Sequence, residues 1–218
     1  MALMKATKKV PKDGVELNEF EATEYAWNIV TDWEPASDTW ALRYGPVVLG
    51  GVSAFCGLLI NNHFRNKLKL GTYGYFASVL PMTIMPGLLT TMFHRHLVTT
   101  DLLLMKNDAC PMCYEIRSAA LQFSLGLGYP LVLAPATSLM LAQRYSTYRV
   151  PELKEGVMVL FQFVRKMTRP FNNALTFMAI GQLFASSVLT YYEMRNNLTI
   201  RGKIMEIEAK LMADKHDS

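Results

Sequence analysis

The chain has 218 residues with 22 basic and 18 acidic side chains, a formal net charge of +4, and 51% hydrophobic residues. These totals alone suit a soluble domain, and the absence of any block of like charge argues against nucleic-acid binding. Three cysteines are too few for a disulfide scaffold.

The distribution of the charges changes this interpretation. Four stretches contain no Asp, Glu, Lys or Arg: Tyr44–Phe64, Leu70–His94, Ser118–Gln143 and Pro170–Tyr192. A membrane-spanning helix needs roughly 20 apolar residues, and a charge at its centre costs roughly 2.5–3.5 kcal/mol. We therefore predict an all-α polytopic membrane protein, a bundle of four transmembrane helices at about 44–62, 72–93, 118–143 and 171–192.

The N-terminal arm, residues 1–43, precedes the first span. No apolar core precedes Tyr44, so we expect no secretory signal peptide, and the acids that follow Asp13 do not suit a transit peptide. Val15–Val30 has a roughly amphipathic helical pattern rich in Glu. Trp33 and Trp40 follow it, and they suit either an aromatic anchor at the membrane interface or a partner-binding arm.

Small residues recur inside the first span. Gly50 and Ala54 are four apart, as are Ser53 and Gly57. This spacing allows close helix approach in lipid, so we predict helix packing through these residues and through Gly126 and Gly128 of the third span.

Prolines interrupt the spans, with Pro81 and Pro86 in the second. They predict bends, and a broken helix of this kind would suit a small transporter. No acidic residue lies within the predicted spans to relay protons, although uncoupled transport remains an alternative.

The third loop contains an apolar run, Gly156–Val164, that is too short to cross a membrane. We predict an interfacial helix at about 151–166. The loop is also basic, and its cations suit anionic lipid, including cardiolipin, or a docking partner. They are Arg144, Arg149, Arg165, Lys166 and Arg169.

The C-terminal tail, residues 193–218, carries Ile200, Ile204, Ile207 and Leu211 at helical spacing. This pattern predicts that the tail continues as an amphipathic helix.

Cys110 and Cys113 are separated by two residues in the second loop. The spacing permits a disulfide, a redox pair, or half of a metal site completed by His94 and His96. A short disulfide or two inert thiols are favoured, while Cys56 suits packing within a span.

No serine–histidine–acid set, phosphate loop or carboxylate pair is visible in the sequence. We therefore predict no enzyme activity, no cofactor and no metal site.

The loop charges predict an orientation. The first and third loops are the basic ones, and positive loops stay on the side from which insertion occurs. In a mitochondrial inner membrane they would face the matrix. Both termini and the cysteine loop would then face the intermembrane space.

Several strings of residues occur together in a specific order and spacing over about Tyr44 to Tyr192. They are Cys56-Gly57-Leu58 with Asn61, Phe64 and Arg65; Cys110-Pro111-Met112-Cys113 with Arg117-Ser118; Tyr129-Pro130; Leu133-Ala134; and Leu141-Ala142 with Arg144-Tyr145. In this combination the chain resembles the transmembrane protein 126 family of the mitochondrial inner membrane.

The resemblance implies a non-enzymatic role in assembling respiratory complex I. It implies as partners the membrane-arm subunits of complex I and other assembly factors. The alternatives are a thiol-active membrane protein that uses Cys110 and Cys113 and the small transporter.

Overall fold

The computed structural model describes residues 17–105, 110–151 and 157–216 of the chain. Some charged residues lie outside these ranges. They include the N-terminal Lys5, Lys8, Lys9 and Lys12, and the loop residues Lys106, Asp108, Glu152, Lys154 and Glu155, whose charges bear on the predicted orientation.

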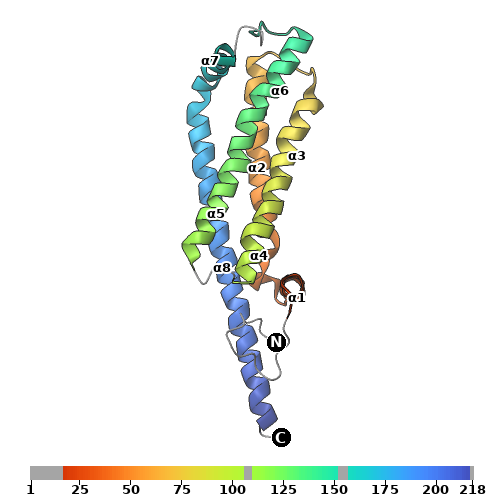
Figure 1. Ribbon diagram of the computed structural model, residues 1–218, viewed down its shortest axis with the longest axis vertical. Helices are drawn as coiled ribbons and strands as arrows, with labels where there is room; N and C mark the ends of the chain where they lie inside the picture. Colours follow the sequence, from red (N-terminus) through yellow and green to blue (C-terminus); the bar gives the residue numbers. More distant parts are fainter. Residues whose placement is uncertain (1–16, 106–109, 152–156, 217–218) are drawn as a thin grey trace. The chain divides into compact units, whose positions relative to one another are not determined.

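The described residues are helical throughout, with short connections (Figure 1). The α-helices are α1 (Glu19–Asp32), α2 (Trp40–Lys67), α3 (Tyr75–His94), α4 (Thr100–Leu103), α5 (Pro111–Phe123), α6 (Tyr129–Tyr145), α7 (Val157–Thr168) and α8 (Asn172–His216). Shorter helical segments join them: η1 (Ala36–Asp38), η2 (Arg95–Thr99), η3 (Ser124–Gly128) and η5 (Arg169–Phe171).

Four helical stretches in the described part of the chain are long and apolar enough to cross a membrane. They are Trp40–Lys67, Tyr75–Leu103, Pro111–Tyr145 and Met158–Ala213. Each contains one of the four charge-free stretches, nearly or completely, so the predicted all-α fold with four spanning helices is confirmed. The predicted helical tail is also confirmed, because α8 runs from the fourth span to His216 without a break.

The chain forms two compact units. Among the described residues, unit 1 contains 17–46, 93–105, 110–118 and 187–216, and unit 2 contains 47–92, 119–151 and 157–186. The two units are described separately below.

Unit 1 begins with α1, whose first turn is stabilised by a reciprocal cap. The backbone N–H of Glu19 donates to Asn18 Oδ1 at 2.7 Å, and the backbone N–H of Asn18 donates to Glu21 Oε2 at 3.0 Å. Such a capping box satisfies donors that a helix start leaves free. The cap explains why the helix expected at Val15–Val30 starts at Glu19.

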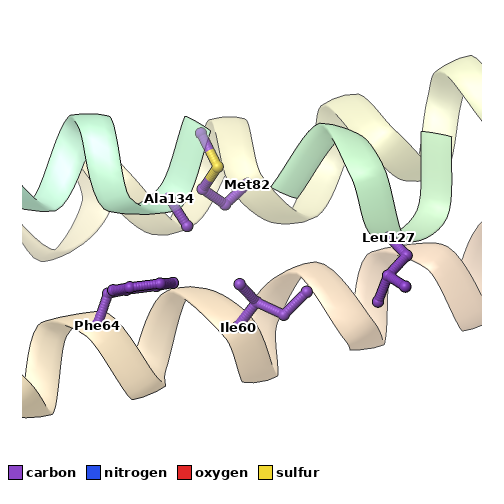
Figure 2. Packing of buried hydrophobic residues seen from close by; sticks show 5 residues of the cluster. All are labelled: Ile60, Phe64, Met82, Leu127 and Ala134. Atoms are coloured by element: carbon purple, nitrogen blue, oxygen red, sulfur yellow. The ribbon is translucent and has the colours of Figure 1, made fainter. Parts of the chain in front are cut away.

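In unit 2, parts of α2, α3, α6 and α8 contribute to an apolar core. Figure 2 shows its centre: Ile60 and Phe64 of α2, Met82 of α3, and Leu127 and Ala134 from η3 and α6. All five are at most 6% exposed. Burying a large apolar side chain contributes roughly 1.5–3 kcal/mol, so this cluster stabilises the four-helix arrangement.

A buried arginine organises the turn between α2 and α3 in unit 2. Arg65 is 3% exposed, and its guanidinium donates to the carbonyl oxygens of Gly71, Tyr73 and Gly74 at 2.7–3.3 Å and to Ser78 Oγ at 2.6 Å. Gly71 and Gly74 have φ of +52° and +57°, which glycine adopts without strain. The sequence alone indicated Arg65 only as a cation after the first span and as part of the strings that carry the family resemblance.

Candidate functional site

The polar centre of unit 1 is a carboxylate and an imidazole from distant parts of the chain. His94 Nε2 lies 3.1 Å from Glu193 Oε1 and 3.2 Å from Oε2. Thr99 Oγ1 donates to both carboxylate oxygens at 3.4 Å. The side chain of His94 is 1% exposed and that of Glu193 is 0% exposed, so the pair is shielded from water.

The cluster extends from His94 to two hydroxyl groups. Thr190 Oγ1 donates to Ser118 Oγ at 2.9 Å, and Ser118 Oγ lies 3.3 Å from His94 Nδ1. One direction of hydrogen-bond donation satisfies every group in this series of hydrogen bonds: Ser118 donates to His94 Nδ1, and His94 Nε2–H donates to Glu193. We call these five residues (His94, Thr99, Ser118, Thr190 and Glu193) the Glu193 cluster.

Five segments of the chain converge on this cluster. α3 ends at His94, the π-helical segment η2 carries Thr99, α5 carries Ser118, and α8 carries Thr190 and Glu193 three residues apart. α2 approaches through Gly45, where a Cβ would lie 2.7 Å from Glu193 Oε1. The carboxylate therefore occupies space that only a glycine leaves open.

The Glu193 cluster corrects one result of the sequence analysis, which found no serine–histidine–acid set. Such a set activates a serine nucleophile when a substrate can reach its oxygen. Ser118 is 0% exposed, so its hydroxyl meets neighbouring side chains and not a substrate. The geometry fits a structural hydrogen-bond network, in which each buried polar group satisfies another.

The N-terminal arm packs within unit 1 through its aromatic residues. The ring of Trp27 lies under Arg95, with 4.2 Å from the guanidinium carbon to the ring centroid, and Trp27 Nε1 donates to Thr100 Oγ1 at 3.2 Å. Arg43 donates to the carbonyl oxygens of Val30 and Trp33 at 2.8 Å. These contacts fix the C-terminal end of α1 within unit 1, and the Trp27 side chain makes its contacts inside this unit.

Between α1 and the C-terminal part of α8, unit 1 has a groove of about 460 Å³. Tyr25, Ile29 and Trp33 line one side, and Ile204, Ile207 and Leu211 line the other. The apolar stripe that the sequence predicted on the tail therefore faces the arm along part of its length.

The predicted packing residues of the first span lie at close contacts within unit 2. A Cβ on Gly50 would collide with Thr91 Oγ1, and one on Gly57 would collide with the carbonyl oxygen of Met82. Ala54 Cβ would lie 3.2 Å from a Cβ on Gly87. These glycines set a short distance between α2 and α3.

The remaining packing candidates differ from one another. A Cβ on Gly126 would lie 2.7 Å from Ser53 Oγ and 2.8 Å from Gln182 Nε2, whereas one on Gly128 would meet only Phe123 O, at 3.7 Å. Ser53 also accepts a hydrogen bond from Gln122 Nε2 at 3.1 Å. The structure thus brings Gly126 and Ser53 together, whereas a Cβ on Gly128 would meet no described atom of another helix within 4 Å.

The two loop cysteines flank the start of α5. Both are free thiols, with Cys110 half-buried and Cys113 exposed, and the Cys113 N–H donates to the Cys110 carbonyl oxygen at 3.1 Å. A hydrogen bond from the Cys113 thiol lowers the pKa of Cys110 below its ordinary value of 9.0. The disulfide between them stays a prediction.

No metal site forms in the part of the chain that the structure describes. Within residues 17–105, 110–151 and 157–216, no group of three or more His, Cys, Asp or Glu side chains could hold an ion. His94, one of the candidate ligands, is turned to Glu193.

The predicted docking cations are exposed in unit 2, at Arg144, Arg149, Arg165, Lys166 and Arg169. The helix expected at about 151–166 is observed as α7, Val157–Thr168. Residues 152–156 lie outside the described ranges, and the interfacial position of the helix stays a prediction. Arg165, Lys166 and Arg169 line one groove with parts of α6 and α8, while Arg144 and Arg149 are not among its lining residues.

These features define an all-helical membrane protein with four spanning helices and an intramolecular network of buried polar groups. Residues 28–202 match the family model described as "Transmembrane protein 126". The chain therefore belongs to the transmembrane protein 126 family, as the sequence strings indicated.

Three relatives illustrate the range of similarity. The chain is 37% identical over 209 residues to "Transmembrane protein 126" of Drosophila melanogaster, covering 95% of this chain and 94% of that one. It is 31% identical over 156 residues to mouse "Transmembrane protein 126A", covering 71% and 76%. It is 30% identical over 108 residues to mouse "Complex I assembly factor TMEM126B, mitochondrial", covering 50% and 46%. No solved structure matches the chain.

Proposed function

We propose that this chain is a non-enzymatic assembly factor of the mitochondrial inner membrane that scaffolds membrane-arm intermediates of respiratory complex I. The observation that carries the proposal is the similarity to mouse TMEM126B, whose name describes a mitochondrial complex I assembly factor. That similarity covers half of this chain, and the family match covers residues 28–202.

The surface of unit 2 supports a scaffold role. Large apolar side chains point outward from α3 and α8, including Phe76 at 72%, Phe177 at 78% and Phe184 at 70% exposure. In lipid, such surfaces associate with other helices by van der Waals fit. A unit whose own helices are held by close glycine contacts can present these outer faces to newly inserted subunits.

The decisive experiment deletes the gene and follows complex I on native gels. We expect stalled membrane-arm intermediates and less mature complex I, both restored when the chain is expressed again. Complexes III and IV serve as internal controls. Normal complex I assembly in the deletion would refute the proposal.

The direct partners are proposed to be membrane-arm subunits and other assembly factors. Affinity purification in a mild detergent, followed by mass spectrometry, should recover them from wild-type cells. A purification that contains no complex I subunit or assembly factor would contradict this part of the proposal.

The proposed orientation places the first and third loops in the matrix and both termini, with Cys110 and Cys113, in the intermembrane space. The exposed cations Lys67 and Lys69 in the first loop and Arg144 and Arg149 in the third support this orientation. Protease treatment of mitoplasts should remove a C-terminal tag, while intact mitochondria should protect it. A tag that stays protected in mitoplasts would contradict the proposed orientation.

A further inference from the structure

Unit 2 contains a groove of about 760 Å³ between α6 and the segment formed by α7, η5 and the first turn of α8. Its lining combines apolar residues, chiefly Leu131, Val132 and Phe161, with the three cations Arg165, Lys166 and Arg169. No acidic side chain is among its described lining residues.

The cations of this groove are held outward because the apolar face of α7 is packed against the rest of unit 2. Leu160, Val164 and Met167 recur at helical spacing and pack against the buried apolar clusters of unit 2. This anchoring fixes the rotation of α7. Arg165 and Lys166, together with Arg169 one turn further, are consequently exposed on the groove side.

These cations face the groove without a carboxylate partner in the described part of the chain. The salt bridges of that part join Asp38, Asp101, Glu193 and Glu206 to other residues. Three cations within five residues therefore leave a local positive charge, which an anion can neutralise.

The apolar part of the groove is accessible at the same time. Val132 is 68% exposed and Phe161 is 62% exposed. A small anion would leave these side chains uncovered, and a neutral chain would leave the cations unpaired. A ligand that satisfies both parts must join an anionic group to a long apolar chain.

We propose that this groove binds one anionic phospholipid, with its phosphate between Arg165, Lys166 and Arg169 and an acyl chain along Leu131, Val132 and Phe161. Charge complementarity identifies the headgroup, because guanidinium forks and ammonium groups bind phosphate oxygens. The membrane location in the proposed function supplies such lipids. The site itself does not depend on any role in complex I.

Native mass spectrometry of the purified full-length chain tests the proposal. The protein is titrated in neutral detergent with cardiolipin, phosphatidylglycerol or phosphatidylcholine. We expect one retained cardiolipin or phosphatidylglycerol molecule and at least roughly tenfold weaker retention of phosphatidylcholine, since each cation near an anionic lipid favours binding.

Two variants examine the two halves of the groove. The triple variant R165Q/K166Q/R169Q should weaken retention of the anionic lipids by at least roughly tenfold. Val132→Trp, at an exposed position, should weaken retention by filling the apolar half while leaving the charge unchanged.

The matched control is K67Q/K69Q/R195Q, which removes three exposed cations that do not line the groove. It should retain anionic lipid within about twofold of the wild-type protein. An equal loss in the control would mean non-specific attraction to surface charge and would overturn the proposal. Equal binding of phosphatidylcholine, or unchanged binding in Val132→Trp, would also overturn it. Because binding is measured on the purified chain, its failure is distinct from a failure in complex I assembly.

Discussion

Unit 1 and unit 2 bury different chemistry at their centres. In unit 2, Ile60 and Phe64 form the apolar core, and the deeply buried amides of Gln122 and Gln182 are neutral. In unit 1, the central contact joins an imidazole to a carboxylate. Hydrogen bonds occur in both units, so the difference lies in an ionisable pair.

This difference predicts which kind of substitution destabilises each unit most. Helices that meet through glycines depend on shape, and an added group forces them apart. A buried ionisable pair depends on both partners, because loss of one leaves the other desolvated without compensation. We therefore expect unit 1 to be most sensitive to removal of side-chain atoms and unit 2 to their addition.

The largest effect should follow removal of the carboxylate in unit 1. Glu193→Ala leaves His94 and Thr99 without their shared acceptor, and we expect a loss of about 3–5 kcal/mol in the free energy of unfolding. Denaturant titration in detergent, followed by circular dichroism, measures it. The exposed Glu206→Ala, whose partner Lys210 is also exposed, should leave stability nearly unchanged, because solvent screens such a pair.

A double-mutant cycle sharpens this test. His94→Leu combined with Glu193→Leu should be less destabilising than the sum of the two single changes, because no ionisable partner is then left alone. Strict additivity would show that the two side chains do not stabilise each other, and the contrast between the units would fail.

In unit 2 the corresponding change adds atoms. Gly57→Leu places a side chain against the Met82 carbonyl oxygen, and overpacking of this kind costs about 1–3 kcal/mol. Gly51→Leu is the matched control on the same helix, because a Cβ at that position would meet no described atom within 4 Å beyond its chain neighbours and the nearby backbone of α2. If both variants unfold alike in the same titration, close α2–α3 packing does not depend on Gly57.

Arg65 is the charged exception within unit 2. Arg65→Lys keeps the charge but provides three donors for four oxygen acceptors and loses the planar fork. We expect a loss of about 1–2 kcal/mol in the free energy of unfolding. Lys67→Arg, at an exposed position two residues further, is the control. Equal stability of Arg65→Lys and the wild-type protein would show that a point charge suffices.

The smallest effect concerns the salt bridge between Asp38 and Lys203 in unit 1. A hydrogen bond from Lys203 lowers the pKa of Asp38 below its ordinary value of 3.8. Its stabilisation is therefore present above pH 3.8 and is lost as pH falls through the lower folded value. Asp38→Asn should reduce stability slightly at neutral pH, and its difference from wild type should vanish in strong acid. A difference that persists in strong acid would exclude this contact as its source.

The four spans were predictable because charge is a local property of the sequence. Each charge-free stretch can enter a membrane without the cost of a buried charge. Gly50 and Gly57 indicate close packing because each lies four residues from another small residue. The helical tail was predictable for the same reason, since Ile200, Ile204 and Ile207 repeat along a single helix.

The Glu193 cluster could not be predicted in this way. Glu193 directly follows a charge-free stretch and therefore resembles the first residue of a solvated tail. Its partner His94 is 99 residues away, and spacing carries no information at that distance. The available signal was a histidine at the end of one charge-free stretch and a glutamate just after another.

Arg65 gives one residue two roles at different times. In the proposed orientation, its guanidinium is among the cations that keep the first loop in the matrix while the chain enters the membrane. In the folded protein the same group binds three backbone oxygens and a serine hydroxyl inside the turn. Because arginine stays charged in proteins, the positive charge proposed to orient the α2–α3 hairpin during insertion also stabilises the turn between these helices in the folded protein.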